Sequence, residues 1–383
     1  MTPDTDIRPE LRRAAGAINI DTDGSLGRFH GARPRRVIRR RIVTATTALA
    51  IAAAAFVFVW VALPSGGDRG MPATSGASGS NGVAGTVAYM VVSEDGAGAT
   101  LASTDVQALT PSALPGGPFA VFPVFSPDGT KVAYGAGADY DHTELTVADA
   151  DGSDPQGLGV EIRGPFSWSP DGSQIAYLRG DELPNGYDVA AVISAGGTDD
   201  RVILAGLAWQ SVAWSPDGDR LLLVGHPAAE SDTSGPDGWD VYSVGLDGTD
   251  LVQLTMTQEW EHLATWSPDG RSIVYTRSTE SSDDADYPSD VWVMSADGSD
   301  PHALTDWRGF DAWPVWSPDG EWIAFASDRD ATDEEQAAFR RGDAFAGVSI
   351  FVMRADGTDV RRIVTADQGQ VLLPGSWRSP VAP

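Results

Sequence analysis

A five-residue string that recurs along the chain constrains the fold more than any other feature of the sequence. WSPDG stands at 168–172, 214–218, 266–270 and 316–320, and FSPDG stands at 125–129. The serines of consecutive copies are 43 to 52 residues apart. Self-similarity at such a period is typical of solenoids and propellers, in which each repeat is one supersecondary unit.

The residues between these copies predict four antiparallel strands per repeat. Each SPDG follows a strand that ends in an aromatic residue and precedes an apolar strand such as QIAYLRG at 174–180. A variable loop, another strand, a DG turn and a short strand that ends in LT complete the repeat, as in ADGSDPHALT at 296–305. β-branched and aromatic runs bounded by Gly, Asp and Pro are typical of strands. Four such strands make one blade of a β-propeller.

Two half-repeats at the ends of this region predict how the ring closes. ASTDVQALT at 102–110 aligns with the outer half of a repeat, and GSWRSPVAP at 375–383 aligns with the inner half. Pairing them makes a sixth blade and leaves no free sheet edge. We therefore expect an all-β fold, a six-bladed propeller of four-stranded antiparallel blades, over residues 85–383.

The repeats also resemble a known family. The segment ADGSDPHALTDWRGFDAWPVWSPDGEWIAFAS at 296–327 is similar throughout to the TolB-like, WD40-like β-propeller repeats. The resemblance covers about 295 residues. It implies the propeller fold and, by analogy with TolB, the binding of partner proteins. TolB's own partners are not implied, because this chain pairs the propeller with a predicted membrane anchor and has no N-terminal globular domain.

The N-terminal part of the sequence predicts a membrane anchor before the propeller. Residues 1–41 hold ten Arg and five acidic residues, and the uncharged run IVTATTALAIAAAAFVFVWVAL follows at 42–63. Its 22 residues span roughly 33 Å as a helix, enough to cross a bilayer. The positive-inside rule places residues 1–41 in the cytoplasm as an Arg-rich tail and the propeller outside the cell. Residues 64–84 read as a Gly/Ser-rich linker. A cleaved signal peptide is the alternative for 42–63, although such peptides have a shorter apolar stretch.

The recurring motifs favour structural roles over chemistry. Pro and Gly suit a tight turn, the Asp caps it, and no His or acid recurs at a fixed distance from the Ser. The DADGSD run at 149–154 resembles an acidic Ca²⁺ loop but lacks the distal Glu, so solvated turns are favoured and no metal ligand or cofactor is assigned. The sequence contains no Cys and no G-x-S-x-G or H-E-x-x-H motif. We therefore predict that the protein is not an enzyme.

Loop lengths divide the propeller into two faces. The spacing from a DG glycine to the next SPDG serine is 17 to 19 residues, whereas that from an SPDG glycine to the next DG glycine is 23 to 37. The SPDG and DG turns share one face (the turn face), and the variable loops share the other (the loop face), where a short helix is expected over DEEQAAFRR. Insertions on one face often mark the binding face. The candidate ligand-binding residues there are Trp209, Trp260, Glu261, His262, Trp307, Arg308, Phe310 and Asp311. Packing of some of these Trp between blades is the alternative.

Charge bears on the ligand class. The formal net charge of −28 combines +5 for residues 1–41 with −33 for the rest. A body this acidic disfavours nucleic acid and favours a basic peptide, a polyamine or a divalent cation as ligand. We expect an extracytoplasmic protein- or ligand-binding module anchored in the cell membrane. A propeller enzyme (a metal-assisted lyase or hydrolase) and a sensor that signals through the Arg-rich tail are the alternatives.

Overall fold

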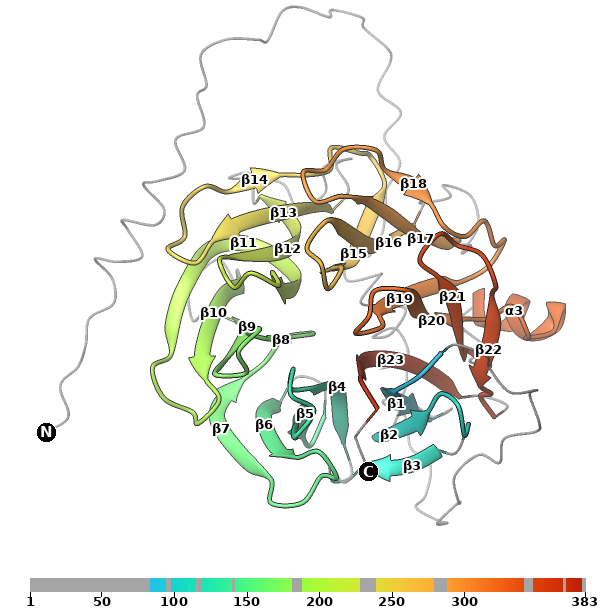
Figure 1. The fold of residues 1–383 in the computed structure, drawn as a ribbon, viewed down its shortest axis with the longest axis horizontal. Helices are drawn as coiled ribbons and strands as arrows, with labels where there is room; N and C mark the ends of the chain where they lie inside the picture. Colours follow the sequence, from blue (N-terminus) through green and yellow to red (C-terminus); the bar gives the residue numbers. More distant parts are fainter. Residues whose placement is uncertain are drawn as a thin grey trace, which may run out of the picture.

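The computed structural model describes residues 83–93, 98–109, 111–114, 117, 119–139, 142–180, 188–227, 239–278, 288–340, 347–367 and 370–380. Their strands form six antiparallel blades around a central axis (Figure 1). Among these residues, no helix is long and apolar enough to cross a membrane. The predicted tail at 1–41 and anchor at 42–63 lie outside the described residues, as do residues 64–82 of the predicted linker at 64–84.

Blades one to five follow one another along the chain, each with its innermost strand first. Blade one contains β4 (Ala120–Phe125), β5 (Lys131–Gly137), β6 (Thr143–Asp149) and β7 (Gln156–Glu161). Blade two contains β8 (Ser167–Trp168), β9 (Gln174–Gly180), β10 (Asp188–Ser194) and the first half of β11 (Arg201–Trp214). Blade three contains the second half of β11, β12 (Arg220–Pro227), β13 (Asp240–Gly245) and β14 (Val252–Gln253).

The other three blades complete the ring. Blade four contains β15 (Trp260–Trp266), β16 (Ser272–Ser278), β17 (Ser289–Ser295) and β18 (His302–Ala303). Blade five contains β19 (Asp311–Trp316), β20 (Trp322–Ser327), β21 (Ser349–Arg354) and β22 (Arg361–Val364), with the expected short helix, α3 (Asp333–Arg340), between β20 and β21. Blade six contains β23 (Val371–Arg378), β1 (Thr86–Val92), β2 (Ala99–Asp105) and β3 (Pro111–Leu114).

Blade six closes the ring as the half-repeats predicted. The C-terminal strand β23 pairs with the N-terminal strand β1, from Thr86 opposite Arg378 to Val92 opposite Val371 (Figure 1). The Trp377 indole Nε1 also donates a hydrogen bond to the Ala84 carbonyl, at 3.1 Å. The first described residues of the propeller therefore lie on the turn face, beside the last strand.

One junction between blades differs from the prediction. Residues 201–214 form the single strand β11, which is the outer strand of blade two and the inner strand of blade three. The two blades thus share one seven-stranded sheet. Trp209, which was predicted to lie in a loop-face loop, belongs to this strand. The segment contains neither Pro nor a DG pair, so no turn chemistry interrupts its extended backbone.

Both faces of each blade are buried against neighbouring blades. Along β9, Ile175 and Tyr177 pack in one apolar cluster, whereas Ala176 and Leu178 pack in the next. Because successive side chains of a strand point to opposite faces, each middle strand contributes to two cores. This explains why these strands read as continuous apolar runs instead of alternating ones.

The SPDG copies form the predicted hairpin turns. In the copy at 267–270, the Ser267 hydroxyl donates to Asp269 Oδ1 at 2.6 Å and accepts from the Ser272 amide at 2.9 Å. The glycines of all five copies adopt φ between 69° and 83°, a left-handed conformation that glycine reaches without steric cost. The serine and aspartate side chains of the motif are therefore hydrogen-bonded within the turn that they stabilise.

Candidate functional site

Glu261, one of the predicted loop-face residues, forms a buried ion pair with Arg277. Glu261 is the second residue of β15 and is fully buried. It accepts a hydrogen bond at 2.9 Å from Nε of Arg277, near the end of β16. The Arg277 guanidinium lies 4.1 Å from the Trp292 ring centroid. Burial raises the pKa of Glu261 to about 7, and Arg277 opposes part of that rise. The Glu261 carboxylate is therefore paired with Arg277 inside the blade.

Asp311 repeats this arrangement in the next blade. It starts β19, is fully buried, and pairs with the Arg329 guanidinium at 2.5 Å. Burial raises the pKa of Asp311 to about 6, and the positive charge of Arg329 opposes that rise. Asp311 and Glu261 both lie five residues before the Trp of their SPDG copies, so the two ion pairs occupy equivalent places in neighbouring blades.

His262 is also inside the blade. Its Nδ1 lies 3.0 Å from the Gln210 Oε1 and its Nε2 lies 3.1 Å from the Ser278 hydroxyl. A neutral ring fits these partners, because Nδ1 donates to the amide oxygen and Nε2 accepts from the hydroxyl. Burial lowers the pKa of His262 to about 3. The residue therefore joins blade three to blade four as a neutral hydrogen-bonding group.

The remaining predicted residues divide between the interior and the surface. Trp209 and Phe310 are buried, with Trp209 packed edge-on against Tyr242. Trp260, Trp307 and Arg308 are partly or largely exposed on the loop face. Trp307 is held by its Nε1, which donates to Asp328 at 2.7 Å. Ligand binding by these residues stays a prediction, and the structure leaves three of the eight side chains available for it.

A different site lies on the axis of the ring, where β-bulges interrupt the inner strands. Register shifts occur between Val121 and Val124 in β4, with equivalent shifts in β11, β15 and β19. Phe122, Leu263 and Trp313, each three residues before the aromatic residue that precedes SPDG, have φ between 52° and 59°. A bulge re-aims side chains locally and often lies beside a functional site.

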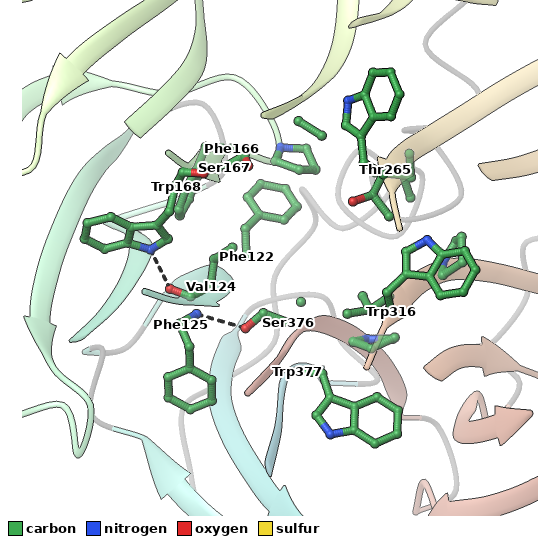
Figure 2. A pocket seen from close by; sticks show the side chains of 18 of the residues that line it. Phe122, Val124, Phe125, Phe166, Ser167, Trp168, Thr265, Trp316, Ser376 and Trp377 are labelled. Carbon is green, nitrogen blue, oxygen red and sulfur yellow. Dashed lines mark hydrogen bonds between the residues drawn. The ribbon is translucent and has the colours of Figure 1, made fainter. Parts of the chain in front are cut away.

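These bulges form the inner end of a central cavity of about 370 Å³ that extends to the serines and prolines of the turn face. Phe122 and Trp313 stack with ring centroids 5.9 Å apart although they come from blades one and five. Figure 2 shows the aromatic walls, including Phe166, Trp168 and Trp316. The cavity's inner end is thus aromatic, and each blade contributes its inner strand to the walls.

The cavity walls carry almost no charge. Among the lining residues that the structure describes, aromatic, aliphatic, Pro and Ser side chains predominate, and Arg378 is the one charged residue. Such a surface suits an apolar ligand with few polar groups. The sequence did not predict this site, because its only available signal was the position three residues before each aromatic residue, where Phe, Pro, Ser, Leu and Trp all occur.

The described residues also bear on metal binding. They contain no cluster of three or more His, Asp, Glu or Cys side chains that is arranged to hold a metal ion. In the DADGSD turn, Asp149 pairs with Lys131 at 2.8 Å and Asp151 accepts from Ser153 at 2.6 Å. Solvated turns stay the prediction for this run.

Comparison with known proteins identifies the fold. TolB from Acinetobacter baumannii matches with a TM-score of 0.59 and 18% identity, over 76% of this chain and 66% of that one. A TolB-related structure from Agrobacterium tumefaciens matches with a TM-score of 0.51 and 19% identity, over 78% of this chain and all of that one. The fold is that of a TolB-like β-propeller.

Other comparisons set the limits of this similarity. The match spans just under two thirds of the Acinetobacter TolB chain. A chain of a nidogen/laminin complex matches the TolB-like propeller with a TM-score of 0.50 and 12% identity, over 76% of this chain and all of that one. Neither the family models nor the curated proteins compared with the sequence match it. At these identities the similarity concerns the fold alone.

Proposed function

We propose that this protein is a membrane-anchored, extracytoplasmic binding module that holds part of a partner protein or ligand in its central cavity and catalyses no reaction. The cavity is the observation that carries the proposal, since its walls are aromatic and nearly uncharged. Concave apolar sites with a few polar groups are the usual form of a ligand site. A similar propeller comes from a nidogen/laminin complex, which is consistent with a partner protein.

The state of the titratable groups supports binding over catalysis. Glu261 and Asp311 are paired with Arg277 and Arg329, and His262 has hydrogen-bond partners at both ring nitrogens. A general base must itself lie within hydrogen-bond reach of the proton that it takes from the substrate. These buried groups are engaged with one another instead, and they lie outside the cavity lining.

The experiment that tests this function is selection of peptide ligands from a random library with purified full-length protein. Leu263→Trp fills part of the cavity, and the blade tolerates the change because Trp313 stands at the equivalent position. Val252→Trp is the matched control, at a residue that is 47% exposed on the outer strand β14. We expect selected peptides to lose at least tenfold in affinity with Leu263→Trp and to keep it with Val252→Trp.

Two results would contradict the proposal in different ways. Failure to select any peptide or compound would refute a binding function. Selected ligands that bind Leu263→Trp normally but fail with Trp260→Ala combined with Trp307→Ala would move the site to the loop face. Turnover of a selected compound would restore the enzyme alternative.

The membrane anchor needs a separate test. The proposal rests on the uncharged run at 42–63 and the ten Arg before it. A phosphatase reporter that works only outside the cytoplasm, fused after Pro383, is expected to be active. Replacing residues 42–63 with a cleavable signal peptide should release the propeller from the membrane fraction. Reporter activity confined to the cytoplasm would refute this topology.

A further inference from the structure

The sixth blade breaks the symmetry of the cavity rim. In blades one to five the residue after the inner-strand aromatic is the SPDG serine, and each of these serines is at most 5% exposed. In blade six the corresponding residue is Arg378, which follows Trp377. One cation therefore stands in a ring of otherwise neutral positions at the turn-face end of the cavity.

Arg378 has no acidic partner among the described residues. Its Nη1 donates to the Gly129 carbonyl at 2.8 Å, and its guanidinium lies 4.2 Å from the Phe125 ring centroid. Its Nε is buried without a hydrogen-bond acceptor. Partial burial lowers the pKa of Arg378, which is the direction expected where no carboxylate offsets desolvation.

This isolation contrasts with several other arginines of the propeller. Arg179, Arg277 and Arg329 are buried or half-buried, and each pairs with a carboxylate. A guanidinium with five N–H donors, of which the structure uses one at Gly129, is suited to bind a carboxylate with two parallel hydrogen bonds.

We propose that the central cavity binds an apolar carboxylate, with the carboxylate at Arg378 and the apolar group among the aromatic walls. This inference rests on the proposed function and specifies its ligand. The cation lies toward the turn face and the Phe122–Trp313 stack lies at the inner end. A ligand therefore enters with its apolar group first and keeps its carboxylate at the rim. The C-terminal residue of a peptide and a free aryl-alkanoic acid both have this chemistry.

The test compares an acid with its neutral amide. Tryptophan fluorescence of the full-length protein is titrated with 3-phenylpropionate and with 3-phenylpropionamide, because five Trp line the cavity. We expect the acid to bind at least tenfold more tightly than the amide. Arg378→Gln should remove this preference, and Arg378→Lys should retain part of it because the charge remains. Arg271→Gln is the matched control, since that arginine is 87% exposed on the same face.

The outcomes separate this inference from a structural role of Arg378 and from failure of the proposed function. Equal affinity for acid and amide, a preference that survives Arg378→Gln, or no binding of either probe at millimolar concentration would overturn it. Library ligands that need the cavity but bind equally well as C-terminal amides would refute the carboxylate and leave the proposed function intact. Tighter binding of N-acetyl-Ala-Ala-Phe than of 3-phenylpropionate would identify a peptide terminus as the source, and the reverse order would identify a free acid.

Discussion

Replacement of His262 by Gln should flatten the acid side of the protein's stability profile. His262 is buried between blades three and four, and its pKa is lowered from 6.5 to about 3. Between these two pH values, His262 is therefore protonated in the unfolded chain and neutral in the folded protein. Stability must fall as the pH falls through this window, because protonation favours the unfolded state there.

The size of the effect follows from the same shift. Between pH 6.5 and pH 5.0 the free energy of unfolding falls by about 1.36 kcal/mol per pH unit, because the buried ring stays neutral. The total loss is about 2 kcal/mol. Gln does not titrate and keeps a donor and an acceptor for Gln210 and Ser278. Loss of the fitted ring should still destabilise the variant by about 1–2 kcal/mol at pH 7.5.

The assay is urea unfolding of wild type and variant at pH 7.5 and pH 5.0. Glu261 and Asp311 have raised pKa values, so acid favours the folded state through them, but they are present in both proteins and cancel in the comparison. Wild type should lose about 2 kcal/mol more than the variant between the two pH values. Parallel losses would show that His262 is accessible to protons in the folded state, and would refute the argument from burial.

Three further changes test the remaining structural arguments. Arg277→Met should lower the free energy of unfolding by about 3–5 kcal/mol at pH 8, because Glu261 is left unpaired. The loss should be smaller at pH 5.5, because the pKa of Glu261 is raised to about 7 and the carboxyl takes up a proton there. An equal loss at both pH values would contradict the pairing. Gly248→Ala should lower the melting temperature more than Gly172→Ala, because a Cβ would lie 2.4 Å from a backbone oxygen at the first site and 3.7 Å from its nearest neighbour at the second. Ser267→Ala should cost about 1–2 kcal/mol through the lost turn hydrogen bonds without changing ligand affinity, and a loss of affinity would give the motif a functional role.

The fold was predictable because its determinants are local and repeated. The glycine and proline of each SPDG fix a turn within four residues, and five copies set the period of the blades. The pairing of β23 with β1 was also predictable from the sequence, because Trp377 stands where the other inner strands have their aromatic residue. The continuous strand β11 was missed because the repeat pattern placed Trp209 in a loop between blades, where the chain in fact stays extended from blade two into blade three.

The site was less predictable because burial between blades is a tertiary property. Trp209, Glu261 and Asp311 look like polar or aromatic surface residues in a loop, yet the packing of adjacent blades buries all three. The central cavity depends on bulges in which Phe122, Trp313 and other residues adopt a left-handed backbone conformation. Neither residue type is a marker for that conformation, so the sequence holds no pattern from which the bulges follow.

These observations change what the acidity of the propeller implies about its ligand. A basic peptide would reach Glu261 or Asp311 only by displacing Arg277 or Arg329, and breaking a buried ion pair costs about 3–5 kcal/mol. Two of the acids that made the loop face a candidate for cation binding are thus neutralised inside their own blades. The unpaired charge at the cavity has the opposite sign, because Arg378 has no carboxylate among the described residues. Net charge governs long-range attraction, whereas the ligand that fits is set by the local charge that has no charged partner, and at Arg378 that charge favours an anion.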